Sequence, residues 1–146
     1  MGREGAMRRF ARLLAMVTAL VACSQGTPGG AASGPDGDKI VLTGDQKADW
    51  AQIVAIENEA KALVKTDDCS SAAQCRTAPV GSKACGGPRY YLVYCSRTTD
   101  SVALFRKLDA VAAAEREYNT RYKIVSTCEF RLPPQLALSG GSCQAQ

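Results

Sequence analysis

Histidine is absent from this chain of 146 residues. The commonest general base of enzymes and the commonest protein ligand for metals are therefore both missing. The sequence also contains no Cys-x-x-Cys pair, which argues against a thioredoxin-like redox site. Zinc would need four thiolates, and the cysteine spacings do not suit that, so we expect neither a metal nor any other cofactor.

A sustained positive charge is also missing once the N-terminus is set apart. The net charge is +4, but residues 1–22 contain four arginines and Glu4. Beyond them, 14 Lys and Arg face 13 Asp and Glu, a net charge of +1. Nucleic-acid binding needs a concentrated positive face, so we expect no nucleic-acid partner.

The apolar run Leu13–Ala22 (LLAMVTALVA) follows several arginines and is too short for a stable transmembrane helix. It predicts a signal peptide over residues 1–22, with Met1 or Met7 as the start. The run ends in Leu-Val-Ala-Cys (residues 20–23), which resembles the bacterial lipobox. This resemblance implies that Cys23 is lipidated and becomes the mature N-terminus.

The resemblance further implies a bacterial lipoprotein held in the membrane by its acyl chains. Ser24, rather than Asp, follows the cysteine, which in diderm bacteria favours the outer membrane. We expect a cell-envelope protein that faces the periplasm or the cell surface. The alternative is an ordinary cleaved signal followed by a chance cysteine.

Residues 23–38 continue as a stretch with five glycines and two prolines and no large apolar residue. Such a composition cannot build a core and predicts a flexible tether of roughly 20–25 Å. We expect one folded domain over residues 39–146. A secreted domain this small often adds disulfides to its limited core.

Six cysteines remain beyond the tether, an even number in an oxidising compartment, so we expect three disulfides. Their 15 possible pairings cannot be separated by spacing alone. The candidates are Cys69, Cys75, Cys85, Cys95, Cys128 and Cys143.

Apolar periodicity predicts helices over residues 46–65, capped by Asp45, and over residues 101–118. We expect Trp50 to anchor the core. The charged residues of the first helix lie off its apolar stripe and are expected in solvent: Asp49, Glu57, Glu59 and Lys61. Strand-like runs occupy residues 39–42, 75–80, 89–95 and 123–130 and the C-terminal tail. The expected fold is α+β: a small antiparallel sheet of four or five short strands, two helices packed on one face, and disulfide staples.

The densest stretch is KACGGPRYYLVYC, residues 83–95. It could place a reactive thiol beside a phosphate-binding glycine loop, or form a stapled turn that enters a strand. Pro88 has no amide hydrogen and no helical pattern follows it, so the stapled turn is favoured.

The motif GxxACGGPxxYLxY (residues 81–94), preceded by Cys-x5-Cys (residues 69–75), resembles a group of uncharacterised secreted cysteine-rich bacterial proteins. Members tend to carry cysteine where this chain has Leu138, and serine where it has Cys95. The resemblance covers about 75 residues, from Cys69 to Cys143, and implies no activity. It suggests that Cys95 takes over the partner that position 138 would otherwise bridge, for which we expect Cys128.

These patterns favour a non-enzymatic, membrane-anchored binding or structural module. Its expected partners are the membrane, through the lipid, and an envelope protein or peptidoglycan, with Arg89 and Tyr91 as contact residues. An alternative is an inhibitor of a protease or lysozyme that presents Arg89 to a trypsin-like pocket.

A small hydrolase is the remaining alternative. Without histidine it would need a carboxylate pair such as Asp67 with Asp68, or a dyad of Ser82 with Lys83. Neither pair has a supporting motif around it, and a capped turn explains the two aspartates more simply than a calcium site does.

Overall fold

The computed structural model describes residues 38–146. The expected signal peptide, Cys23 and nearly all of the expected tether lie outside the described residues. The described elements follow one another as α1 (Gln46–Leu63), the 3₁₀ turn η1 (Ala72–Gln74), β1 (Cys75–Val80), β2 (Tyr90–Cys95), α2 (Ser101–Arg121), β3 (Leu136–Ser139) and β4 (Ser142–Ala145).

Both helices begin at an aspartate. The carboxylate of Asp45 accepts the backbone N–H of Ala48 at 2.8 Å, and that of Asp100 accepts the N–H of Ala103 at 2.9 Å. Each bond satisfies a free donor of the first turn. The prediction of Asp45 as a cap is confirmed, and α1 ends two residues before the predicted limit.

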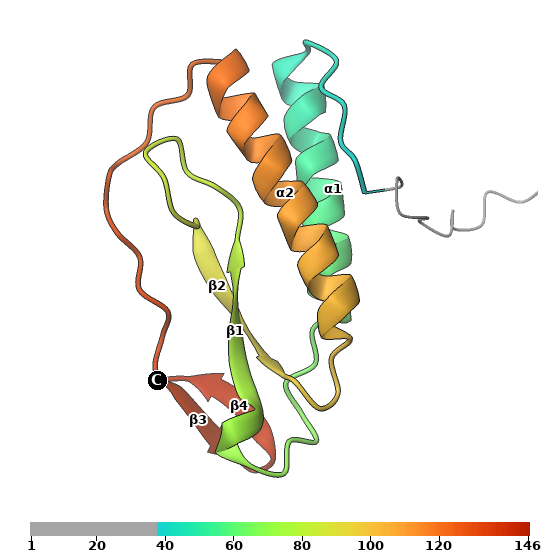
Figure 1. Ribbon diagram of the computed structural model, residues 1–146, viewed down its shortest axis with the longest axis vertical. Helices are drawn as coiled ribbons and strands as arrows, with labels where there is room; N and C mark the ends of the chain where they lie inside the picture. The colour runs from blue at the N-terminus through green and yellow to red at the C-terminus, as the bar shows by residue number, and fades with distance from the viewer. Residues whose placement is uncertain (1–37) are drawn as a thin grey trace, which may run out of the picture. The chain divides into compact units, whose positions relative to one another are not determined.

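The two helices lie side by side on one face of the β1–β2 hairpin, as Figure 1 shows. One apolar cluster joins both helices to the hairpin, and it comprises Ala60, Ala78, Val80, Tyr94, Leu104 and Leu108. A second cluster fills the other half of the helix pair, and it comprises Leu42, Ile53, Val111, Ala114 and Tyr118. Trp50 packs against this second cluster, with its ring centroid 5.3 Å from that of Tyr118.

The β1–β2 hairpin is antiparallel, with Cys75 opposite Cys95 and Val80 opposite Tyr90. Alternate residues of β2 point to opposite sides. Tyr90, Leu92 and Tyr94 pack against the helices, whereas Val93 and Cys95 pack toward the C-terminal hairpin.

The C-terminal tail forms a second hairpin of β3 and β4 instead of the single strand expected. Leu138 lies opposite Cys143, and the turn uses Gly140 and Gly141 at φ of 57° and 80°, a region that glycine adopts without strain. The α+β class with two helices and disulfides is therefore confirmed. The strands of the described residues form two separate two-stranded sheets, where we expected one sheet of four or five strands.

Two expected strands are absent from the described chain. Residues 39–42 run as a strap beside α1 and α2, and residues 123–130 belong to a long connection between α2 and β3. The alternation that predicted a strand over 123–130 is real, because Ile124 and Ser126 are partly buried while their neighbours are exposed. No backbone ladder accompanies it, since side chains make the contacts.

Candidate binding surface

All six predicted cysteines are in disulfides: Cys69 with Cys95, Cys75 with Cys143, and Cys85 with Cys128. The expectation that Cys95 bridges Cys128 is wrong. The physical reason is distance along the fold: Cys95 ends β2 beside the C-terminal hairpin, whereas Cys128 lies in the connection that passes the β1–β2 loop.

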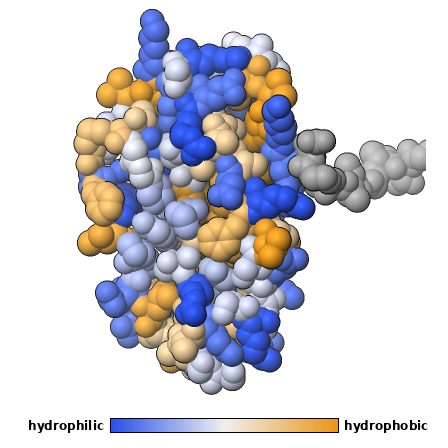
Figure 2. Space-filling model, in the orientation of Figure 1, coloured by the Kyte–Doolittle hydropathy of each residue, from blue (hydrophilic) through white to orange (hydrophobic). Residues whose placement is uncertain are grey.

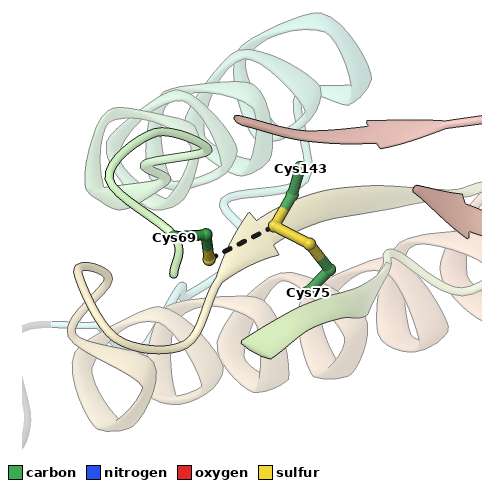
Figure 3. Close-up of side chains that lie close together, drawn as sticks. All are labelled: Cys69, Cys75 and Cys143. Atoms are coloured by element: carbon green, nitrogen blue, oxygen red, sulfur yellow. Dashed lines mark hydrogen bonds between the residues drawn. A yellow bond between two sulfur atoms is a disulfide. The ribbon is translucent and has the colours of Figure 1, made fainter. Parts of the chain in front are cut away.

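Two of these disulfides lie against each other beneath the C-terminal hairpin. The Sγ atoms of Cys69 and Cys143 are 3.3 Å apart, and Leu138 packs against the same group. Figure 3 shows Cys69 next to the bond between Cys75 and Cys143. The sulfurs of Cys69, Cys75 and Cys143 lie within 4.8 Å of one another, the spacing of a metal site. Each sulfur is already bonded to another sulfur, so the group offers no thiolate and acts as a double cross-link.

A network of charged side chains with two buried carboxylates joins the helices to the hairpin. Arg89 donates from Nε to Glu115 at 2.8 Å, and its Nη2 pairs with both Glu57 and Glu115. The hydroxyl of Tyr90 donates to Glu57 at 2.5 Å, and Lys61 pairs with Glu57 at 2.7 Å. The expectation of a solvated Glu57 is therefore wrong. The residue is 4% exposed, because Arg89 and Tyr90 of the hairpin cover its carboxylate.

The network sets the ionisation of its members. Burial alone would raise the pKa of Glu57, but the hydrogen bonds from Lys61, Tyr90 and Arg89 outweigh it and hold that pKa below its usual value. Burial and the bond to Glu57 raise the pKa of Tyr90. Two buried carboxylates are thus neutralised by Arg89 with help from Lys61, which leaves no free charge at this interface.

A third buried carboxylate, that of Asp49, ties the N-terminal strap to the end of α2. It accepts the N–H and the hydroxyl of Thr43, both at 2.7 Å, the N–H of Gly44 at 3.2 Å and the hydroxyl of Tyr122 at 2.6 Å. Burial opposes ionisation, yet these donors hold the pKa of Asp49 well below its usual range. Burial and the same bond raise the pKa of Tyr122 to about 12. The expectation of a solvated Asp49 is also wrong, because donors from the residues before α1 and from the end of α2 enclose its carboxylate.

Glu115 also fixes the β1–β2 loop. It accepts the N–H of Ser82 at 2.6 Å, while Asn119 donates from Nδ2 to the carbonyl of Ser82 at 2.8 Å. Gly81 has φ of 73°, and a Cβ there would lie 2.7 Å from Nε of Arg89 and 2.8 Å from Oε1 of Glu115. Only glycine fits this close approach. A pocket of about 280 Å³ opens next to it, with Trp50 among its lining residues.

The loop in turn holds the connection of residues 123–134, which we call the 123–134 connection. Cys85 bonds to Cys128 and donates its N–H to Oγ of Ser126 at 3.0 Å. Lys83 donates from Nζ to the carbonyl of Glu129. Figure 1 shows the connection running along the outside of the molecule, past the hairpin.

The far end of the connection is held by Tyr91, whose hydroxyl donates to the carbonyl of Arg131 at 3.3 Å. Between the hairpin and this end lies a hollow of about 390 Å³, lined by Tyr90, Tyr91, Phe130 and Leu132 among others. The connection therefore stands off the hairpin and is attached at a few points.

Large apolar side chains project from this connection into solvent. Val125 is 91% exposed, Phe130 78% and Leu132 73%. They are three of the five large apolar residues that are strongly exposed in residues 38–146. Figure 2 shows apolar atoms at the edge of the molecule along which the connection runs. Exposed apolar groups gathered in one place are typical of interaction surfaces.

The residues predicted as contacts have different fates. Arg89 is engaged by two carboxylates and is not presented to solvent as a free basic side chain. Tyr91 is half-buried and holds the 123–134 connection.

Asp67 and Asp68, the carboxylate pair considered for a hydrolase, are exposed in the bend after α1, where Asp67 accepts the N–H of Thr66 at 3.2 Å.

Ser82 and Lys83, the dyad considered for a hydrolase, each form hydrogen bonds with other residues. The backbone of Ser82 bonds Glu115 and Asn119, and the amine of Lys83 bonds the connection. No hydrogen bond joins the two side chains in the part of the chain that the structure describes.

Two features of this region are not predicted from the sequence. Glu115 continues the apolar stripe of α2 after Leu104, Leu108 and Val111, and a carboxylate on a buried stripe could have indicated a buried partner. The exposure of Phe130 and Leu132 had a weaker signal, the two prolines that follow them at residues 133–134.

The search for related proteins gave no identification. No model of a protein family, no curated protein and no solved structure matches this chain. None of the helices in residues 38–146 has the length and apolarity needed to cross a membrane.

Proposed function

We propose that this protein is a lipid-anchored envelope protein whose domain is a non-enzymatic binding module. The lipobox-like Leu-Val-Ala-Cys at residues 20–23 supports the anchor at Cys23. The partners are the membrane, through the acyl chains, and another envelope or secreted protein. The 123–134 connection is the binding surface.

The exposure of Phe130 and Leu132 on a held segment is the observation that carries this proposal. An unattached loop could turn such side chains inward and reduce their contact with water. Here the disulfide at Cys128 and the bonds from Lys83 and Tyr91 oppose that movement. A segment fixed with its apolar side outward loses little conformational entropy when a partner covers it.

Binding is favoured over catalysis by the state of the charged groups. Glu57 and Glu115 are paired with Arg89, and the amine of Lys83 bonds a carbonyl of the connection. The charged side chains around the loop thus have structural partners, which leaves the apolar connection as the open feature of this region.

The anchor is tested by feeding cells an alkyne-tagged fatty acid and isolating the protein from the membrane fraction. Label is expected on the full chain and lost in Cys23→Ala, which should also leave the membrane fraction. Cys128→Ala is the control, because it removes a cysteine that we assign to a disulfide. Equal labelling of the chain and of Cys23→Ala would remove the anchor from the proposal.

The binding surface is tested by placing a photo-activated cross-linking residue at position 130 of the full chain in its native envelope. A discrete adduct of higher mass is expected there. The control position is Val102, which is 83% exposed but lies on α2. Adducts at both positions, or at neither, would contradict a binding surface on the connection.

A further inference from the structure

We propose that residues 128–133 form a substrate-like loop that occupies the active site of a serine protease selective for large apolar side chains, with Phe130 as the specificity residue. This inference rests on the proposed function, since it names the partner of the same surface. It gives the inhibitor alternative a different residue from the Arg89 suggested by the sequence.

The backbone on either side of Phe130 is held by the domain. Lys83 bonds the carbonyl of Glu129, and Tyr91 bonds the carbonyl of Arg131. The N–H and C=O of Phe130 itself have no hydrogen-bond partner among residues 38–146, and its side chain is 78% exposed. Phe130 therefore presents a large apolar side chain together with its own free backbone groups.

Proteases of this class bind those two features. The main chain of an extended substrate pairs with the enzyme through hydrogen bonds, and one side chain enters a specificity pocket. A hydrophobic pocket of the chymotrypsin kind accepts a phenylalanine ring. Neither feature is useful without the other, and Phe130 offers both.

The neighbouring residues fit the role less well. The carbonyl of Arg131 is bonded to Tyr91, so it is not presented for attack. Leu132 precedes Pro133, and the peptide nitrogen between them carries no hydrogen and belongs to a ring. The Phe130–Arg131 bond is thus the one in this stretch that an enzyme could address.

Attachment on both sides explains why the loop would inhibit. The serine hydroxyl adds to the Phe130 carbonyl, its proton passes through the enzyme's histidine to the departing nitrogen, and the Phe130–Arg131 C–N bond breaks. The new amine of Arg131 stays close, because the disulfide at Cys128 holds one side and the Tyr91 contact holds the other. The amine can attack the acyl-enzyme in reverse, which restores the peptide bond and the free serine.

The test is a titration of the mature full chain in detergent micelles against chymotrypsin, subtilisin and trypsin, each with a small chromogenic substrate. We expect stoichiometric inhibition of chymotrypsin or subtilisin and none of trypsin. Phe130→Ala should weaken inhibition by about 30-fold or more, the usual loss at a central interface residue. Phe130→Arg should transfer inhibition to trypsin.

Val102→Ala is the matched control and should inhibit as the parent chain does, because its exposed side chain lies on α2. Retained far-UV circular dichroism will show that each variant is folded. Inhibition of trypsin by the parent chain would assign the role to Arg131 and overturn this inference.

Two other results would also overturn it: rapid cleavage after Phe130 without inhibition, or no effect on any of the three enzymes. If the cross-linked adduct at position 130 persists in either case, the binding surface stands and only the protease assignment fails. If no adduct forms either, the proposed function fails as well.

Discussion

The helix–hairpin interface and the 123–134 connection differ in which side chains they bury and which they expose. The interface buries Glu57 and Glu115 at 4% and 1% exposure, whereas the connection holds Phe130 and Leu132 at 78% and 73%. Charged groups are inside and apolar groups outside, the reverse of the usual arrangement. Both regions meet at the β1–β2 loop, where Ser82 bonds Glu115 and Lys83 bonds the connection.

The difference shows how one region serves the other. The buried charges are paired, so their interface contributes a defined geometry, which is one role of buried polar networks. That geometry fixes the loop, and the loop fixes the connection through Cys85. The connection can then expose apolar groups without folding back over the hairpin. The disulfide and the buried network stabilise the chain and so offset the free energy that this exposure costs.

The largest stability effect is expected from removing the staple that joins the two regions. Cys85→Ser with Cys128→Ser opens a cross-link between residues 43 apart, which in the loop-entropy description stabilises by about 4 kcal/mol. Urea unfolding should show that loss. Amide hydrogen exchange should rise in residues 125–132 more than in α1. A uniform rise would mean that the staple supports the whole domain equally.

Breaking the buried network should cost less. Glu115→Gln leaves Arg89 with one carboxylate and is expected to lower the free energy of unfolding by roughly 2–4 kcal/mol, measured by urea unfolding. Glu117→Gln is the control on the same helix: its exposed pair with Arg121 at 3.2 Å should be worth less than about 1 kcal/mol. Equal effects of the two changes would show that the network does not depend on burial.

Acid should weaken the attachment of the N-terminal strap to the helix pair and leave the connection's cross-link intact. The pKa of Asp49 is lower in the folded chain than in the unfolded chain, so its contribution is present above about pH 4 and is lost as the pH falls below that value. Asp49→Asn cannot titrate, and the partners of Asp49 are uncharged donors, whereas Glu115 pairs with the charged Arg89, so Asp49→Asn should destabilise less than Glu115→Gln. The gap in urea midpoint between Asp49→Asn and the parent chain should be widest at pH 7 and narrow at pH 3.

Asp45→Asn is the control for this series, because asparagine caps helices about as well as aspartate. Its gap from the parent chain should stay small at pH 7, where both residues cap the helix. A gap for Asp49→Asn that widens in acid would contradict the assigned direction of the pKa shift.

A smaller effect is expected from moving a disulfide at the opposite end of the hairpin. Cys95→Ser alone removes a bond worth about 2–4 kcal/mol. Because Leu138 packs against the same cystines as Cys69, Cys95→Ser with Leu138→Cys should form a bond from position 69 to position 138 and restore stability to within about 1 kcal/mol. Peptide mapping without reduction will identify the pair. A free thiol at position 138 would show that the backbones do not approach closely enough.

Much of this fold follows from local patterns in the sequence. The apolar stripes and the aspartates at 45 and 100 define both helices, and the Tyr, Leu and Val of residues 90–95 define β2. The charged residues of α1 are predicted to lie in solvent because they fall off its apolar stripe. Asp49 and Glu57 have near donors as well, but they are enclosed by partners far along the chain: Tyr122, Tyr90 and Arg89. Such partners are invisible to any local pattern.

The 123–134 connection was misread for a related reason. Alternation of apolar and polar residues over 123–130 predicts a strand. The same alternation also suits a segment that side chains such as Lys83 hold in place without a backbone ladder. The predicted bond between Cys95 and Cys128 is wrong for a similar reason, because disulfide pairing depends on which segments the fold brings together. Local order was therefore predictable here, whereas the course of the 123–134 connection depends on long-range contacts.

The smallest stability effect should come from the exposed apolar residues, and it decides how the comparison is read. Phe130→Ser and Leu132→Ser remove side chains that contact water, so each should change the free energy of unfolding by no more than about 0.5 kcal/mol. Leu104→Ala, at 0% exposure in the core, is the contrast and should cost about 2–5 kcal/mol. Urea unfolding of the three variants will measure this. If Phe130→Ser destabilised the chain as Leu104→Ala does, the connection would be part of the core. Near-neutral stability of both variants, together with a lower yield of the position-130 adduct when Leu132→Ser is added to the chain that carries the cross-linking residue, would instead mean that these side chains face outward for a partner.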